Sequence, residues 1–163
     1  MMSDSNSNVQ TLLDEYAQGP ARLREAVAGL SDRQLRTPAP PGVWSVLQIV
    51  CHIADFEIVY ADRIKRILVE DRPTMFSGDP DQFAARLAYD QRDVEEELSV
   101  ITAVRAQVTR ILRTAAPADF EREGIHSTDG PMSLALLLKR IGGHIPHHVK
   151  FITDKRPALL TVK

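Results

Sequence analysis

The chain has 163 residues and a formal net charge of −2, with 20 basic and 22 acidic residues spread along its length. This length fits one compact domain with one sizeable core, so we expect a single domain over residues 1–163, with residues 1–8 disordered. The balanced charge provides no cationic surface, which argues against nucleic acid and anionic membranes as partners. The single cysteine, Cys51, excludes an internal disulfide and a CxxC-type zinc site. Because no signal-like or membrane-length apolar run occurs, a cytoplasmic location is expected.

The first part of the chain predicts one long helix followed by a break. Apolar residues at mixed three- and four-residue spacings indicate an amphipathic helix over residues 9–30, and Gly19-Pro20 predicts a kink within it. A turn or short helix is expected at residues 31–35. The sequence TPAPPG at residues 37–42 cannot continue a helix, because proline removes backbone donors and restricts the residue before it. This segment is therefore a connection.

A second long helix begins after this connection. Ser45 followed three residues later by Gln48 is a capping-box pattern, in which each side chain satisfies an unpaired backbone N–H group. The helix should extend from Ser45 to about residue 70. Residues 71–80 contain the proline, glycine and aspartate of a loop, and a short helix is expected at residues 82–89.

The second half of the chain predicts two more long helices. Residues 90–114 carry an apolar stripe at helical spacing, with the three glutamates at 95–97 toward solvent. Residues 115–131 form a loop long enough to cross an end of the domain or to act as a lid. The last helix should cover residues 132–154. No segment shows sustained strand alternation, so we expect an all-α four-helix bundle with unequal loops and a crossover connection.

Three histidines occur within five positions in GGHIPHHVKFI, residues 142–152. His148 occupies a position of the apolar stripe of the last helix, and His144 lies one turn earlier on the same side, so both rings should project inward together. His147 shares a face with charged residues and should face solvent. Pro146 should kink the helix at this turn.

His52 is a candidate third member, because it shares an inward face of the second helix with apolar residues. Two histidines four residues apart are a modest signal, and packed core histidines are the alternative. Three inward histidines would, however, each need partners for two ring nitrogens, and a shared cation would supply them. Neutral imidazoles suit Zn, Ni, Fe or Cu, and three ligands leave open positions, as in catalytic sites. We expect a divalent transition metal, Zn, Ni, Fe or Mn, as the cofactor.

Two segments carry a resemblance to a known family. WSVLQIVCHIADFE at residues 44–57 and HIPHHVKFI at residues 144–152 resemble the DinB/YfiT-like superfamily of four-helix bundles. The resemblance implies that His52, His144 and His148 are metal ligands. Many members have glutamate where this chain has Gln48, which cannot act as a base.

The resemblance also implies a function. Characterised members use the metal to hold a low-molecular-weight thiol, such as bacillithiol or mycothiol, as thiolate for transfer to an electrophile. We therefore expect a metal-dependent thiol S-transferase that acts on a small-molecule substrate. The alternatives are a metal-dependent hydrolase and a non-catalytic metal-binding or stress-related bundle. A homodimer is expected in each case, because bundles with an apolar outer strip commonly pair.

Three further residues have open roles. Asp55, one turn after His52, is expected to orient an imidazole, with a general base and a solvated carboxylate as the alternatives. Cys51 points away from His52 around the helix and is expected to be a buried apolar side chain rather than a catalytic thiol. His126 could reach the mouth of the site, but a histidine on a mobile loop is the favoured interpretation.

Overall fold

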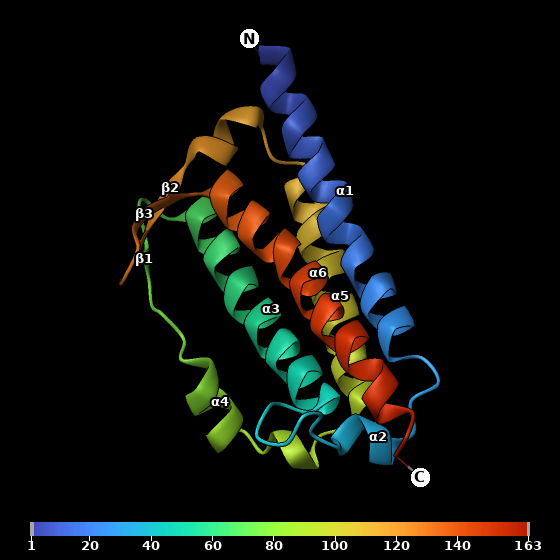
Figure 1. Ribbon diagram of the computed structural model, residues 1–163. Helices are drawn as coiled ribbons and strands as arrows, with labels where there is room; N and C mark the ends of the chain where they lie inside the picture. Colours follow the sequence, from blue (N-terminus) through green and yellow to red (C-terminus); the bar gives the residue numbers. More distant parts are fainter. Residues whose placement is uncertain (1, 163) are drawn as a thin grey trace.

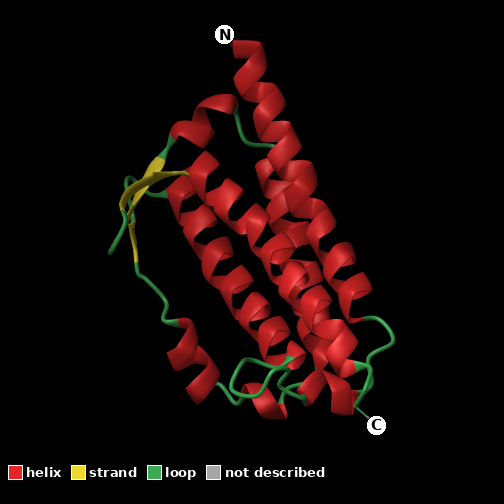
Figure 2. Ribbon diagram, viewed as in Figure 1, coloured by secondary structure: helices red, strands yellow, loops and turns green. Residues whose placement is uncertain are grey.

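The computed structural model describes residues 2–162, and the side chains of residues 8–162, as a helical bundle with a small sheet at its side (Figures 1 and 2). Four long helices form the bundle: α1 (Met2–Val27), α3 (Val46–Val69), α5 (Val94–Leu112) and α6 (Leu134–Leu159). The shorter elements are α2 (Asp32–Arg36), α4 (Pro80–Arg86), two 3-10 turns (Tyr89–Gln91 and Pro117–Glu121), β1 (Thr74–Met75), β2 (Glu123–His126) and β3 (Gly130–Ser133). No helix of the described part is long and apolar enough to cross a membrane.

The connections between the four long helices make two neighbouring pairs parallel, α1 with α6 and α3 with α5. α1 packs against α6 and α5, and α3 packs against α5 and α6. Figure 1 shows α1 and α6 descending in the same direction, while α3 and α5 ascend. The segment between α3 and α5 therefore returns along the whole bundle, and β1 and α4 lie on this return path. This is the predicted crossover connection, and its helical parts pack against α3.

The predicted capping signal at the second long helix is confirmed. The Ser45 hydroxyl accepts a hydrogen bond from the Gln48 backbone N–H, and the Gln48 side chain accepts one from the Ser45 backbone N–H. Similar side-chain caps begin α5 at Asp93 and α6 at Ser133. These caps satisfy backbone donors that a helix start leaves unpaired. The helix starts are thus fixed locally by the sequence.

Two prolines lie inside long helices: Pro20, where the sequence predicted a kink, and Pro157, which was expected to lie beyond the end of the last helix. α1 begins at Met2 and continues through Pro20. Pro20 frees the carbonyl of Tyr16, and Arg105 Nη1 donates to that carbonyl at 2.7 Å. α6 passes through Pro157 to Leu159, beyond the predicted end at residue 154. A tertiary donor therefore replaces the backbone bond lost in α1.

The sheet was not predicted. β1 pairs in parallel with β2, at Thr74 with Ile125, and β2 pairs antiparallel with β3, at Glu123 with Ser133. Strands of two to four residues contain too few positions to show alternation in the sequence. The sheet ties the two long loops together beside the end of α3 and the start of α6 (Figure 2).

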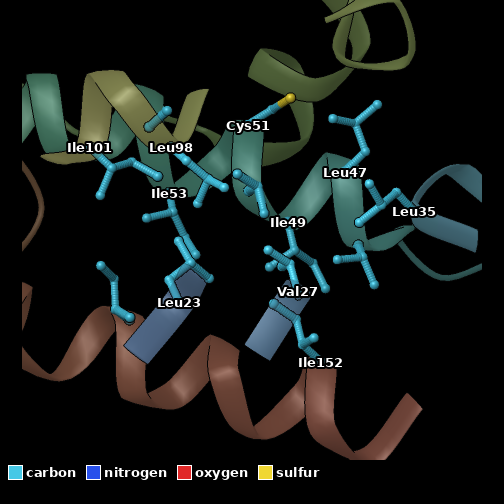
Figure 3. Packing of buried hydrophobic residues seen from close by; sticks show 14 of the residues in the cluster. Leu23, Val27, Leu35, Leu47, Ile49, Cys51, Ile53, Leu98, Ile101 and Ile152 are labelled. Carbon is cyan, nitrogen blue, oxygen red and sulfur yellow. The ribbon is translucent and has the colours of Figure 1, made fainter. Parts of the chain in front are cut away.

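The apolar core consists of two clusters, one toward each end of the bundle. Figure 3 shows the cluster nearer the start of α3, where Leu23, Ile53, Ile101 and Ile152 meet from four helices and Cys51 packs at the side. The second cluster lies around Leu13, Ile64, Val108, Leu112 and Leu138. Burial of these apolar side chains supplies the main stabilisation of the fold.

A buried polar layer lies where the two clusters meet. Arg105 is 1% exposed and Glu57 is fully buried, and Arg105 donates to Glu57 Oε1 through Nε at 2.8 Å and Nη2 at 2.5 Å. Tyr16 donates to Glu57 Oε2 at 3.1 Å, and Arg105 also donates to the Ile141 carbonyl at 2.9 Å. A Cβ on Gly19 would lie 2.1 Å from Arg105 Nη1, so only glycine leaves room for this guanidinium. The layer joins all four long helices.

Candidate metal centre

The three predicted histidines converge between α3 and α6. His52 Nε2 lies 2.9 Å from His144 Nε2, and His148 Nε2 lies 3.1 Å from the same atom. The three ring nitrogens all lie within 4.8 Å of one another. His52 comes from the first turns of α3, and the other two come from successive turns of α6. The prediction that these side chains meet is thus confirmed, while metal binding by them stays a prediction.

The donor set fits a shared cation better than it fits hydrogen bonds alone. A neutral imidazole nitrogen carries either one proton or one lone pair, so His144 Nε2 cannot form two full hydrogen bonds with its neighbours. Three Nε2 lone pairs on one ion would resolve this conflict. At a typical Zn–N distance of about 2.0–2.1 Å, tetrahedral ligand nitrogens stand about 3.3 Å apart, a few tenths of an ångström wider than the two shortest pairs here.

The other ring nitrogens are consistent with this arrangement. His52 Nδ1 and His144 Nδ1 are buried and have no hydrogen-bond partner in the described part of the chain. With Nε2 on an ion, Nδ1 would carry the ring proton, and such N–H groups usually find an acceptor. These two nitrogens therefore offer places for ordered water around an occupied site.

Burial keeps all three imidazoles neutral. Desolvation lowers the pKa of His52 and of His148 to about 4, from the usual value near 6.5. Desolvation and the neighbouring histidines lower the pKa of His144 to about 2. A ring of Trp44 and a ring of Phe56 flank His52, with centroids 5.2 and 4.6 Å away. At neutral pH the lone pairs are thus available to a metal ion without competition from protons.

Two nearby side chains stay outside the centre. His147 is exposed on the solvent side of α6, as predicted, and its ring contacts Phe151. Cys51 is fully buried in the apolar core, where desolvation raises the pKa of its thiol to about 12. A thiol with so high a pKa is almost entirely protonated at neutral pH, which agrees with the predicted packing role.

Asp55 does not contact the histidines through a hydrogen bond in the described structure. Both of its carboxylate oxygens accept from Arg92 Nη1 at 3.0 Å, and Arg92 also binds Glu97. Glu97 is 6% exposed, so the expectation that all three glutamates at 95–97 face solvent is wrong for this one. Arg92 belongs to the crossover segment and forms ion pairs with both Asp55 and Glu97. The expected orienting role of Asp55 therefore has no direct contact to support it.

A cavity of about 310 Å³ adjoins the histidine cluster. His52 and His144 form one part of its wall, and β2 and the loop after it form another. The complete lining is His52, Phe56, Tyr60, Arg63, Ser77, Gly78, His126, Thr128, Asp129, Arg140 and His144. The cluster is thus accessible from a concave space of mixed polar and apolar lining, built by α3, α6 and the two long loops.

His126 belongs to this cavity and does not lie on a free loop. It is 8% exposed on β2, paired with Gly130 across the hairpin. Its Nδ1 lies 3.1 Å from Thr128 Oγ1, and the backbone N–H groups of Thr128 and Asp129 point to it at 3.5 and 3.4 Å. Because Nδ1 accepts, neutral His126 carries its proton on Nε2 and can donate a hydrogen bond but cannot act as a base there. The favoured interpretation of a mobile loop histidine is wrong.

The sequence reasoning missed two arginines of this region. Arg63 lines the cavity, and Arg105 forms the polar layer next to it. Each arginine lies on the inward, otherwise apolar face of its helix. A charged residue at such a position could have been recognised in the sequence as a buried polar group. Arg63 lies eleven residues after His52, just over three full turns, and so shares its face of α3.

Comparison with known proteins supports the same organisation. The protein is similar to YfiT from Bacillus subtilis, whose solved structure is described as "a probable metal-dependent hydrolase with an unusual four-helix bundle topology". The two structures superpose with a TM-score of 0.87 and 27% identity, over 93% of this chain and 87% of YfiT. The parallel pairing of α1 with α6 and of α3 with α5 is in keeping with an unusual topology.

Sequence relatives carry the same kind of name. A protein of Oceanobacillus iheyensis named "putative metal-dependent hydrolase" is 28% identical over 92% of this chain and 87% of its own length. One of Geobacillus thermodenitrificans with the same name is 32% identical over 84% of this chain and 78% of its own. A model of the DinB superfamily matches residues 15–152, which include all three histidines of the centre. The chain belongs to the DinB superfamily.

Proposed function

We propose that His52, His144 and His148 hold one divalent transition-metal ion, such as Zn, Ni, Fe or Mn, and that the protein transfers a low-molecular-weight thiol to an electrophile. The observation that carries this proposal is the convergence of three neutral Nε2 atoms at the wall of a cavity. A divalent ion at such a site can hold a coordinated thiol as thiolate, or lower the pKa of bound water to about 7.

The cavity favours an enzyme over a metal-binding module without turnover. A structural metal site is closed by four protein ligands, whereas a catalytic site keeps a position open to substrate. Here three histidines form the cluster, and a space of about 310 Å³ reaches two of them. Thr128, Tyr60 and Ser77 add polar groups that a substrate could contact.

The carboxylates of this region favour thiol activation over hydrolysis. Metal-assisted hydrolysis gains from a general base that takes a proton from water. Asp55 is bound by Arg92, Glu57 by Arg105, and Asp129 by Arg140 at 2.6 Å, which holds the pKa of Asp129 below its usual value. A thiol needs no such base, because coordination alone deprotonates it.

Hydrolysis is the second candidate, since the relatives are named as metal-dependent hydrolases. The thiol could be bacillithiol or mycothiol, as the family resemblance suggests, but the donor groups of the cavity do not select one of them. The two activities make opposite predictions for a single coordination experiment.

The test begins with the metal content of untagged protein, measured by inductively coupled plasma mass spectrometry for the wild type and for His52→Ala after dialysis against each metal salt. About one ion per folded wild-type chain, lost in the variant, supports the centre. Absorption spectra of the Co²⁺ form with added 2-mercaptoethanol then distinguish the reactions. A sulfur-to-cobalt band with consumption of thiol and 1-chloro-2,4-dinitrobenzene supports transfer. If that band is absent and p-nitrophenyl acetate is turned over, hydrolysis is favoured. A folded wild type that binds no metal overturns both the transferase and the hydrolase proposals.

A further inference from the structure

Arg63 is a buried cation without a carboxylate partner among the side chains that the structure describes. It is 5% exposed, its Nη2 donates to the Phe76 carbonyl at 2.5 Å, and its guanidinium lies 4.9 Å from the centre of the Tyr60 ring. Tyr60 forms a side-chain hydrogen bond with it, and the adjacent exposed Asp62 attracts it through space but forms no ion pair with it. Charged groups this deeply buried are normally paired with an opposite charge. Among the described side chains, Arg63 is therefore a buried positive charge without an ion-pair partner, at the wall of the cavity.

The other groups at this end of the cavity leave the positive charge unbalanced. Arg140 and Asp129 also line the wall, but they form an ion pair with each other at 2.6 Å and so cancel. Neutral His126 presents an N–H group at Nε2, since its Nδ1 accepts from the hairpin. The surplus is thus one positive charge, next to a neutral donor, which matches a monoanion such as a carboxylate.

Arg63 and two histidines of the cluster, His52 and His144, line the same cavity. His52 and Arg63 share one face of α3 and are separated by eleven residues, about 16 Å along the helix axis. Phe56 and Tyr60 lie between them on that face and also line the cavity. A molecule that reached both Arg63 and the cluster would be elongated, with a central part in contact with aromatic rings.

We propose that the cavity binds an elongated substrate that carries a carboxylate, with this group paired to Arg63 and His126 and with the reacting end at the three histidines. The inference rests on the proposed function for the identity of the reacting end, but the carboxylate subsite is formed by residues outside the cluster. It assigns Arg63 a role in substrate selection. Anchoring of the loop through the Phe76 carbonyl alone would not produce a preference for an anion.

The first experiment needs no metal. Hexanoate and hexan-1-ol are titrated into the metal-free protein, and backbone amide shifts are followed by nuclear magnetic resonance. We expect hexanoate to produce saturable shifts at Ser77, Thr128 and Asp129. The affinity for hexan-1-ol should be at least about tenfold lower. Arg63→Met should remove the preference. Arg66→Met is the matched control, because Arg66 lies on the same helix but is paired with Glu70 at the surface.

The second experiment uses the Co²⁺ form with 6-mercaptohexanoate and 6-mercaptohexan-1-ol, together with their shorter and longer homologues. The acid should bind about tenfold more tightly than the alcohol at the chain length that spans the cavity. Arg63→Lys should keep part of this preference because it keeps the charge. Loss of Co²⁺ binding with hexanoate binding retained would refute the metal centre but not the subsite. Equal affinity for acid and alcohol, or no recovery with lysine, would overturn the subsite and leave the metal centre standing.

Discussion

The bundle contains two buried polar regions that differ in how their hydrogen-bonding capacity is used. In the layer of Arg105, Glu57 and Tyr16, each charged group meets a partner, and the guanidinium also binds two backbone carbonyls. In the cluster of His52, His144 and His148, three acceptors face one another and two ring nitrogens have no partner in the described structure. The first region is closed on itself, and the second is open to an added ligand.

This difference separates a structural role from a functional one. Buried polar groups cost free energy unless they are hydrogen-bonded, so a network whose members satisfy one another serves to fix the packing of the helices. A cluster left incomplete must gain its compensation from something that binds. Substitutions in the first region should therefore change stability, and substitutions in the second should change ligand binding.

The largest expected effect is the loss of metal binding when a cluster histidine is removed. His144→Ala and His148→Ala should each weaken divalent-metal affinity by on the order of 10³-fold, because one of three ligands is lost. His147→Ala should bind as the wild type does, since its ring is exposed. Isothermal titration with Zn²⁺ measures these affinities. Urea unfolding checks that each variant is folded, because each inward replacement opens space in the core. An equal loss in all three variants would contradict the assignment of faces on α6.

The next effect concerns the closed region. Arg105→Met should lower the free energy of unfolding by about 3–5 kcal/mol, because the buried Glu57 charge and the Tyr16 carbonyl lose their partner. The double variant with Glu57→Gln should recover part of that loss, since no unpaired charge remains. Urea denaturation measures both. The folded fraction of Arg105→Met should still bind about one metal ion per chain, and loss of that binding would mean that the two regions are coupled.

A third effect is the acid sensitivity of the metal-free protein. The cluster histidines have folded-state pKa values near 4 or below, against about 6.5 in the unfolded chain, so the unfolded state takes up protons first as pH falls. The stability of the folded state should therefore decrease from about pH 6.5 toward pH 4, by up to about 1.4 kcal/mol per pH unit for each histidine that stays neutral. Urea unfolding with a chelator present, repeated across this range, gives the slope. The slope for His148→Leu should be smaller than the slope for the wild type, because one buried neutral histidine is removed. Equal slopes in the two proteins would show that the ring of His148 protonates freely in the folded state.

Much of the fold and the cluster could be predicted because the signals were local or periodic. The Ser45 cap depends on residues three positions apart, and the inward placement of His144 and His148 follows from helical spacing alone. The helix through Pro20 was predicted, but the donor that replaces its lost backbone bond was not, because that donor belongs to Arg105, 85 residues later in the chain. The sheet and the position of His126 likewise depend on pairing between two distant loops. The expected homodimer involves a second chain, so it stays a prediction.

The smallest expected effect is at Asp55, which borders both kinds of region. Asp55→Asn should change metal affinity by less than tenfold, because the carboxylate is already engaged by Arg92 and makes no hydrogen bond to the described histidines. Zinc titration of this variant beside Glu97→Gln, which removes the other carboxylate on Arg92, gives a matched comparison. Replacement of a residue that orients a metal-bound imidazole typically lowers metal affinity by about 10–100-fold. A loss of that size in Asp55→Asn alone would mean that Asp55 leaves Arg92 for His52 once the metal is bound. A small and equal effect in both variants would place Asp55 with the closed, structural network.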